Sequence, residues 1–226
     1  MGTGAPHKLR IPLIVLAAVN LVVLGIRLWP WQEVVNLPGS GTTGYDPAIC
    51  LLACIGLIYW ISSTEDESFK KGLAAGAKLG LLAGLMLVEQ VALVARSSSH
   101  SRLVEAGLLG TAGILWGVAG LYGSRTSGNV GIGMVCGLWS AIVSCLMACS
   151  AVLTEMYLAG PPPTPQDPWL QYEGLAIGNS ATQALVHSLN TATEFLLIGP
   201  LLGLAVGLVF SFFGQSQEAE PGQSAK

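Results

Sequence analysis

Residues 183–213 read QALVHSLNTATEFLLIGPLLGLAVGLVFSFF and contain a single charged side chain, that of Glu194. About twenty apolar residues are enough to carry an α-helix across the hydrocarbon core of a bilayer. This block is longer than that, and the Gly199-Pro200 pair near its middle predicts a kink, because proline lacks a backbone N–H donor. The sequence therefore predicts a long, bent membrane helix in this part of the chain.

The composition extends this prediction to the whole chain. Of its 226 residues, 52% are hydrophobic and 10% are charged, and the mean hydropathy is +0.62. A soluble domain carries about 25% charged residues, so these charges are too few to cover a soluble surface. We expect an all-α, polytopic membrane helical bundle in one domain (11–213), between a cytoplasmic N-terminal tail (1–10) and a disordered C-terminal tail (214–226). Its six transmembrane helices are predicted at about 11–29, 47–62, 72–95, 104–123, 129–154 and 183–213.

Basic residues predict the orientation, because cytoplasmic loops carry an excess of Lys and Arg. In the six-span arrangement most basic residues fall on one side, namely Lys8, Arg10, Lys70, Lys71, Arg125 and Lys226. Arg96 and Arg102 fall on the other, external side, and Arg27 lies near the external end of the first span. We therefore expect both termini to be cytoplasmic. No N-x-[ST] glycosylation motif is present, which favours a bacterial inner membrane as the plasma membrane concerned.

Two loops, 30–46 and 155–182, are predicted to be external and carry no Lys or Arg. The second contains the proline-rich run at 161–168, which favours a stiff polyproline II segment. This run is a candidate docking surface for an external partner. Its plainer interpretation is a spacer between the last two spans.

Small residues recur every four positions along two of the predicted spans. Four residues advance a helix by about 400°, so such residues form one ridge on which a neighbouring backbone can approach closely. The candidate helix-packing residues are Gly72, Gly76, Gly80, Gly84, Gly199, Gly203 and Gly207. A similar series, Ala106, Gly110, Gly113, Gly117 and Gly120, lies in the fourth predicted span. The pattern indicates a tight bundle, or alternatively a surface for self-association.

Polar side chains inside the apolar blocks are the candidate functional residues. Only Lys78, Glu89 and Glu194 are charged and lie well inside a block. Ionisable groups in lipid are costly and often functional, although the long stem of Lys78 can reach the headgroups. In the last span, one polar face is predicted from Gln183, His187, Asn190, Thr191 and Glu194, which recur at spacings of three and four. We expect this face to point inward or toward water. The transport or proton-handling candidates are Glu89, Gln90, His187, Asn190, Thr191 and Glu194.

Cysteines add a second pattern at a similar depth. The pairs Cys50/Cys54 and Cys145/Cys149 are each spaced by four residues, so the two thiols of each pair share a helix face. Soft metals such as Cu(I) or Zn²⁺ favour thiolates, but buried free cysteine more commonly serves as a small apolar side chain. We prefer the packing interpretation and leave a metal site undecided. Cys136, the fifth cysteine, also lies in an apolar block.

Several functional classes are excluded or disfavoured. The net charge of −3 without a long basic run gives no nucleic-acid footprint. The chain contains no G-x-x-x-x-G-K-[ST], H-E-x-x-H or G-x-S-x-G motif, so we expect neither an enzyme nor a cofactor. One hypothesis is a small-solute, ion or proton transport protein, or its membrane subunit, with a polar cavity between the third and sixth spans. The alternative is a non-catalytic structural or assembly subunit. The expected partners are the lipid bilayer and either another membrane protein or further copies of the chain.

Overall fold

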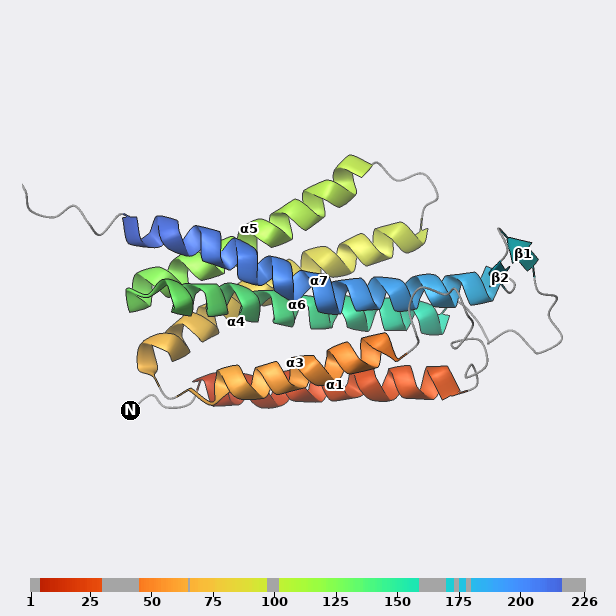
Figure 1. The fold of residues 1–226 in the computed structure, drawn as a ribbon, viewed down its shortest axis with the longest axis horizontal. Coiled ribbons are helices and arrows are strands. Elements are labelled where there is room, and N and C mark those ends of the chain that lie inside the picture. The colour runs from red at the N-terminus through yellow and green to blue at the C-terminus, as the bar shows by residue number, and fades with distance from the viewer. Residues whose placement is uncertain are drawn as a thin grey trace, which may run out of the picture.

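The computed structural model describes residues 5–29, 45–64, 66–96, 102–158, 170–172, 175–177 and 180–216. Six long helices run along a common axis (Figure 1). They are α1 (Ala5–Leu28), α3 (Asp46–Ser62), α4 (Glu67–Arg96), α5 (Arg102–Ser127), α6 (Val130–Leu158) and α7 (Ser180–Ser216). The predicted all-α class is therefore confirmed.

Four of the helices are long and apolar enough to cross a membrane. These candidate spans are Glu67–Val94, Leu103–Ser127, Val130–Leu158 and His187–Gln215. The two shorter apolar helices are Arg10–Ile26 and Asp46–Ser62. The chain is thus a multi-pass membrane protein by helix length and hydropathy. The six-span topology and the side on which the termini lie stay predictions.

The predicted external loop between α6 and α7 contains two short strands. β1 (Leu170–Tyr172) pairs antiparallel with β2 (Leu175–Ile177), with Gln171 opposite Ala176. The proline-rich run at 161–168 lies outside the described residues. We use the two strands to name the ends of the bundle: the hairpin end is where α6 finishes and α7 begins, and the other is the N-terminal end (Figure 1).

α7 is a single helix from Ser180 to Ser216 that includes Pro200. It begins before the block predicted from residue 183 and ends two residues beyond Gly214. Membrane helices tolerate proline, because neighbouring helices and local adjustment satisfy the freed backbone carbonyl. The rest of the predicted C-terminal tail lies outside the described residues.

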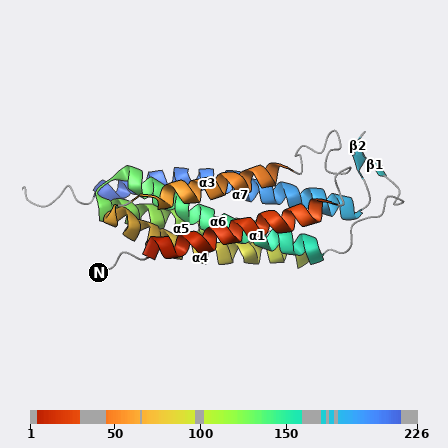
Figure 2. The same ribbon diagram turned by 90° about the horizontal axis from the view of Figure 1, so that it is seen from below.

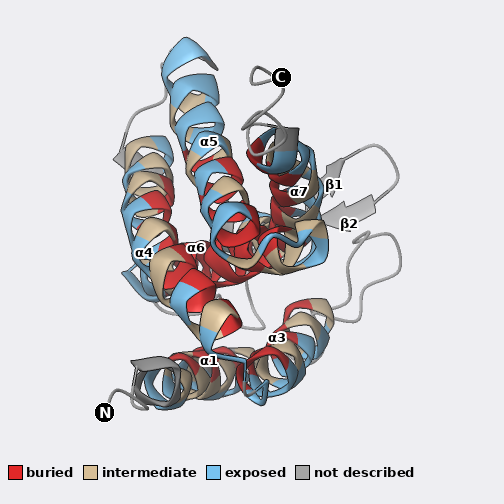
Figure 3. Cartoon of the chain, turned by 90° about the vertical axis from the view of Figure 1, so that its left-hand side faces the viewer, coloured by how far each residue is buried: buried red, intermediate tan, exposed pale blue. Residues whose placement is uncertain are grey.

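α6 is the central helix of the bundle. α4, α5 and α7 surround it on one side, and α1 and α3 form a layer on the other (Figures 2 and 3). Its segment from Cys136 to Leu146 is buried throughout, including the large side chain of Trp139. In lipid, helix association depends on close van der Waals packing rather than on a hydrophobic driving force. The many small residues of α6 meet that requirement because they let three helices approach at once.

Candidate functional site

The small-residue ridge of α4 lies against α6. A Cβ atom at Gly76 would lie 3.0 Å from the carbonyl oxygen of Cys136, and one at Gly80 would lie 2.5 Å from that of Ser140. One turn further along, a Cβ at Gly84 would meet the side chain of Met147. Both helices advance together through these contacts, so α4 and α6 are parallel and in close backbone contact.

The small-residue ridge of α7 lies against α6 from another side. Its contacts run in the opposite direction along α6, since Gly199 meets Cys145, Gly203 meets Ala141 and Gly207 meets Gly137. α7 is therefore antiparallel to α6, and α5 and α6 lie between it and α4 (Figure 3).

These contacts place Glu89 and Glu194 at the same height along the bundle. Gly84 and Gly199 both contact the turn 144–147 of α6. Glu89 lies five residues beyond Gly84, and Glu194 lies five residues before Gly199 in an antiparallel helix. Five residues rise about 7.5 Å, so the backbone positions of both residues lie about that far from the shared turn, toward the hairpin end.

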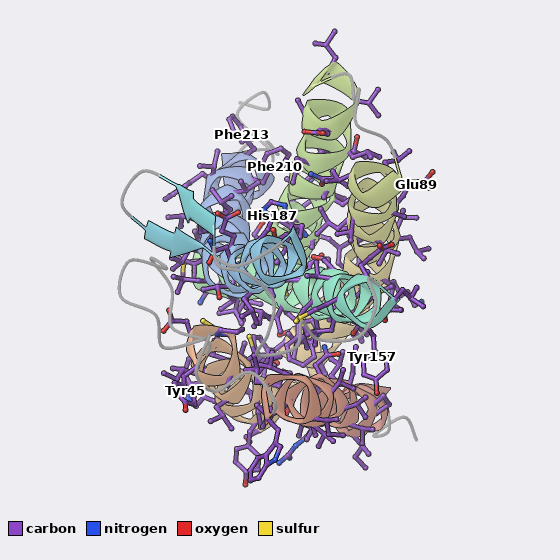
Figure 4. The ribbon with its side chains drawn as sticks, turned by 90° about the vertical axis from the view of Figure 1, so that its right-hand side faces the viewer. Tyr45, Glu89, Tyr157, His187, Phe210 and Phe213 are labelled. Carbon is purple, nitrogen blue, oxygen red and sulfur yellow. The ribbon has the colours of Figure 1, made fainter. Side chains whose placement is uncertain are left out.

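The structure does not bring the two carboxyl groups together within one chain, because α5 and α6 separate α4 from α7 (Figure 3). Glu89 is exposed and projects away from the other helices (Figure 4). Its neighbour Gln90 is half-buried, and the Oε1 atom of Gln90 is buried without a hydrogen-bond partner among the described residues. Lys78, nearer the N-terminal end of α4, is also exposed.

His187 and Glu194 of the polar face of α7 point away from α6, so these two side chains do not turn inward within the chain. The other expected orientation of this face, toward water, stays a prediction. His187 and Glu194 are exposed (Figure 4 shows His187), and Thr191 is half-buried. The reason is helical geometry. Glu194 lies nine residues from Gly203, or about 900°, on the opposite side of the helix. When the glycine ridge packs on α6, the polar face must point outward.

Some polar side chains of this face have interaction partners in the structure. The Thr191 hydroxyl donates a 2.9 Å hydrogen bond to the backbone carbonyl of His187. Asn190 is half-buried and takes part in an interaction of its own. The side chain of Gln183 lies outside the described residues. The exposed ionisable groups of this face are thus His187 and Glu194.

Three cysteines, Cys50, Cys54 and Cys149, lie together where α3 meets α6, whereas Cys136 lies against Gly72 of α4 and Gly123 of α5. Cys54 and Cys149 are buried in one apolar cluster, against which the half-buried Cys50 packs. Cys145 is buried in the adjoining cluster with Trp116. Among the described residues, no group of three or more His, Cys, Asp or Glu side chains is arranged to hold a metal ion. This burial favours packing as the role of the thiols.

Sequence reasoning missed four hydrogen bonds between helices, which involve Asn20, Trp116 and Ser211. Asn20 of α1 donates to the carbonyl of Leu146 and accepts from Ser150. The Trp116 indole N–H of α5 donates to Ser144 at 2.9 Å, and Ser211 of α7 donates to the carbonyl of Gly120 at 3.3 Å. A lone Asn or Ser in an apolar block gives little signal, because its partner is defined only by packing.

Two pockets lie away from these polar residues. One, of about 310 Å³, lies at the N-terminal end and is lined mainly by apolar side chains, among them Trp60, Phe69 and Ile132, with Asp66 also in its lining. The other, of about 300 Å³, lies between α1 and α3 at the hairpin end.

Comparison of the chain with protein-family models, with curated proteins and with solved structures finds no match to any of them. The fold and the candidate spans define the chain as a multi-pass integral membrane protein in contact with the lipid bilayer.

Proposed function

We propose that this protein is a non-catalytic subunit of a larger membrane assembly, in which neighbouring protein covers two polar flanks of the bundle. The α4 flank is the exposed surface around Glu89, and the α7 flank is the exposed surface around His187 and Glu194. The observation that carries the proposal is the exposure of both glutamates on helices of membrane-spanning length.

The energetic reason is the cost of an acid in hydrocarbon. An ionised carboxylate in the middle of a span costs roughly 2.5–3.5 kcal/mol on insertion scales. The glutamate side chain is short, so it reaches the headgroups less readily than Lys78 does. A neighbouring helix that donates hydrogen bonds to these carboxyl groups would offset the cost. We therefore assign the two flanks to protein contacts rather than to lipid.

The bundle itself is suited to such a role. The contacts of Gly80 and Gly203 with α6 bring backbones close together, and close packing of this kind makes a scaffold with few alternative arrangements. A rigid scaffold holds its two flanks at a fixed spacing, as a structural subunit requires.

Transport of a small solute, ion or proton is the second candidate, favoured by the equal height of Glu89 and Glu194. In this case the polar path would follow the contact between flanks of adjacent proteins. Glu89, His187 and Glu194 would exchange the ion or proton, and Gln90, Asn190 and Thr191 would supply uncharged hydrogen-bonding groups. Carboxyl groups and histidine are suited to this exchange because their pKa values respond strongly to their surroundings.

We also propose the six-span topology, with both termini in the cytoplasm of a bacterium. Reporter tags on each terminus and in the loop 30–46 would test it in whole cells, using a reagent that cannot cross the membrane. The termini should be protected and the loop should react. Reaction at either terminus in intact cells would contradict this orientation.

The subunit proposal can be tested in native membranes with a lipid-soluble carbodiimide, which reacts with carboxyl groups exposed to lipid. Glu89 and Glu194 should be protected in the membrane and should react after a denaturing detergent separates the proteins. Full reaction of both residues in the native membrane would overturn the proposal.

Native mass spectrometry after mild extraction provides the second test. The chain should appear in a stoichiometric complex that Glu194→Gln weakens. The matched control is Glu67→Gln, which changes an exposed residue that forms a 3.6 Å surface ion pair with Lys70. Equal loss of the complex in both variants would show that Glu194 has no specific role.

The transport candidate requires a flux assay with the assembled protein in liposomes. Proton or cation flux should occur, and Glu194→Gln should abolish it. Unchanged flux in this variant would remove Glu194 from the transport mechanism.

A further inference from the structure

The two flanks lie on different sides of the bundle but at one height. We infer that each flank is covered by another copy of this chain, so that α4 of one copy packs head to tail against α7 of the next and Glu89 meets Glu194. This inference rests on the proposed function, since it names the protein that covers the flanks.

Equal height is the feature that points to a second copy. Copies in one membrane are related by rotation about the membrane normal, and such a rotation leaves the depth of every residue unchanged. A head-to-tail contact therefore requires that the groups that meet lie at the same depth in both flanks. Glu89 and Glu194 satisfy this condition, because each lies five residues from a glycine that contacts the turn 144–147 of α6. An unrelated partner on either flank would impose no such match.

The placement of the flanks determines the type of contact. A two-fold contact joins one surface patch to the same patch of its partner. In this bundle α5 and α6 lie between α4 and α7 (Figure 3), so a two-fold contact through one flank leaves the other uncovered. A heterologous contact joins the α4 flank to the α7 flank, and a closed ring covers every flank of every copy.

Apolar side chains beside each acid complete the surface. Leu85 lies one turn from Glu89 and is 56% exposed, and Leu201 lies two turns from Glu194 and is 61% exposed. Each flank thus combines an apolar contact area with one carboxyl group. The apolar side chains supply packing, and the carboxyl groups fix the register of the two helices.

The two carboxyl groups are chemically complementary when they share one proton. Two carboxylates in contact would repel each other, so the contact is favourable only when the pair holds one proton between the two groups. The protonated carboxyl then donates a hydrogen bond to the carboxylate of the other copy, a charge-assisted contact that is stronger than a neutral hydrogen bond. Each contact in the ring therefore buries one negative charge instead of two.

Cysteine cross-linking in the native membrane tests this arrangement. In a chain whose five native cysteines are replaced by alanine, Glu89→Cys and Glu194→Cys are introduced together or singly, and copper phenanthroline oxidises the thiols. The chain with both substitutions should give a ladder of cross-linked copies, whereas each single variant should give none. Coexpression of the two single variants should give a cross-linked dimer. Val22→Cys, a 59% exposed position on α1, should not cross-link to Glu194→Cys and serves as the control.

Several results would overturn the inference. Dimers from Glu194→Cys alone would show a two-fold contact through α7. A complex of one copy with a different polypeptide would overturn the inference but leave the subunit proposal standing. A monomer whose two glutamates react fully with carbodiimide would overturn both. The unaltered chain provides a check that needs no substitution, because native mass spectrometry should show a closed ring larger than a dimer, and a dimer would contradict the head-to-tail contact.

Discussion

Asn20 of α1 accepts a 2.9 Å hydrogen bond from the Ser150 hydroxyl of α6, although 130 positions separate the two residues in the chain. The Asn20 amide also donates to the carbonyl of Leu146 at 3.2 Å, and Asn20 is only 3% exposed. This pair is thus a polar link between the α1–α3 layer and the rest of the bundle.

A double-mutant cycle should measure this link. Asn20→Ala and Ser150→Ala should each destabilise the protein, and the two losses should not add, because either change removes the same hydrogen bond. Hydrogen bonds between membrane helices have coupling energies of about 0.6–1.7 kcal/mol. Unfolding by a denaturing detergent in mixed micelles gives the four free energies. Additivity within about 0.3 kcal/mol would show that the contact contributes nothing.

The closest approach of α4 to α6 predicts a large effect from one added methyl group. In Gly80→Ala the new Cβ would lie 2.5 Å from the Ser140 carbonyl oxygen, so the helices must separate. We expect a loss of about 1–3 kcal/mol, typical of overpacking. Gly113→Ala on α5 is the matched control, because nothing lies within 4 Å of its Cβ position, and it should stabilise the helix by about 0.5–1 kcal/mol. Equal effects in the same detergent titration would contradict the close contact.

Burial of the thiols predicts their order of reaction with a maleimide. Cys54, Cys136, Cys145 and Cys149 are buried, whereas Cys50 is half-buried. Maleimides react with accessible thiolates, which apolar surroundings disfavour. In the folded protein Cys50 alone should react, and its reaction should be slow. All five cysteines should react after denaturation. Mass spectrometry of peptides identifies the labelled sites, and Tyr45→Cys, a 56% exposed position, supplies a reactive reference. Rapid labelling of Cys145 in the folded protein would contradict the packing.

Asp66 caps the first turn of α4 and makes its stability depend on pH. The Ser68 hydroxyl and backbone N–H donate to the Asp66 carboxylate at 2.7 and 2.8 Å, and these bonds lower its pKa. The cap is therefore fully formed above the ordinary Asp pKa of about 3.9 and is lost as the pH falls through the lowered value. Hydrogen exchange at the Ser68 amide should accelerate in acid relative to Asp66→Asn, which keeps a capping oxygen. An unchanged ratio between the two proteins at all pH values would contradict this.

Helix positions could be predicted well from the sequence because apolar blocks of membrane length have few alternatives. The direction of each face could not. On α7 the glycine ridge and the polar face both favoured burial, and they lie on opposite sides of the helix. The sequence does not reveal that Gly203 packs on α6 and that Glu194 is therefore exposed. The spacing of nine residues between them did contain the information that both could not face the same neighbour.

The small residues of α5 show a second limit. Gly110, Gly113, Gly117 and Gly120 belong to one series in the sequence. A Cβ atom at Gly117 would meet Phe210 of α7, and one at Gly120 would meet Gly207. A Cβ atom at Gly110 or Gly113 would have nothing within 4 Å. Small residues spaced by three or four positions predict that a close approach is sterically allowed. Whether another helix arrives depends on the crossing angle, which one chain segment does not encode.

The lengths of the helices differ across the bundle. α3 has 17 residues and α6 has 29, which at 1.5 Å per residue is about 25 Å and about 43 Å. The hydrocarbon core of a bilayer is about 30 Å thick. A membrane that surrounds the whole bundle must become thinner beside α3, or the protein must tilt to compensate. The hydrophobic mismatch therefore differs around the bundle, because α3 is shorter than the hydrocarbon core and α4, with 30 residues, is longer.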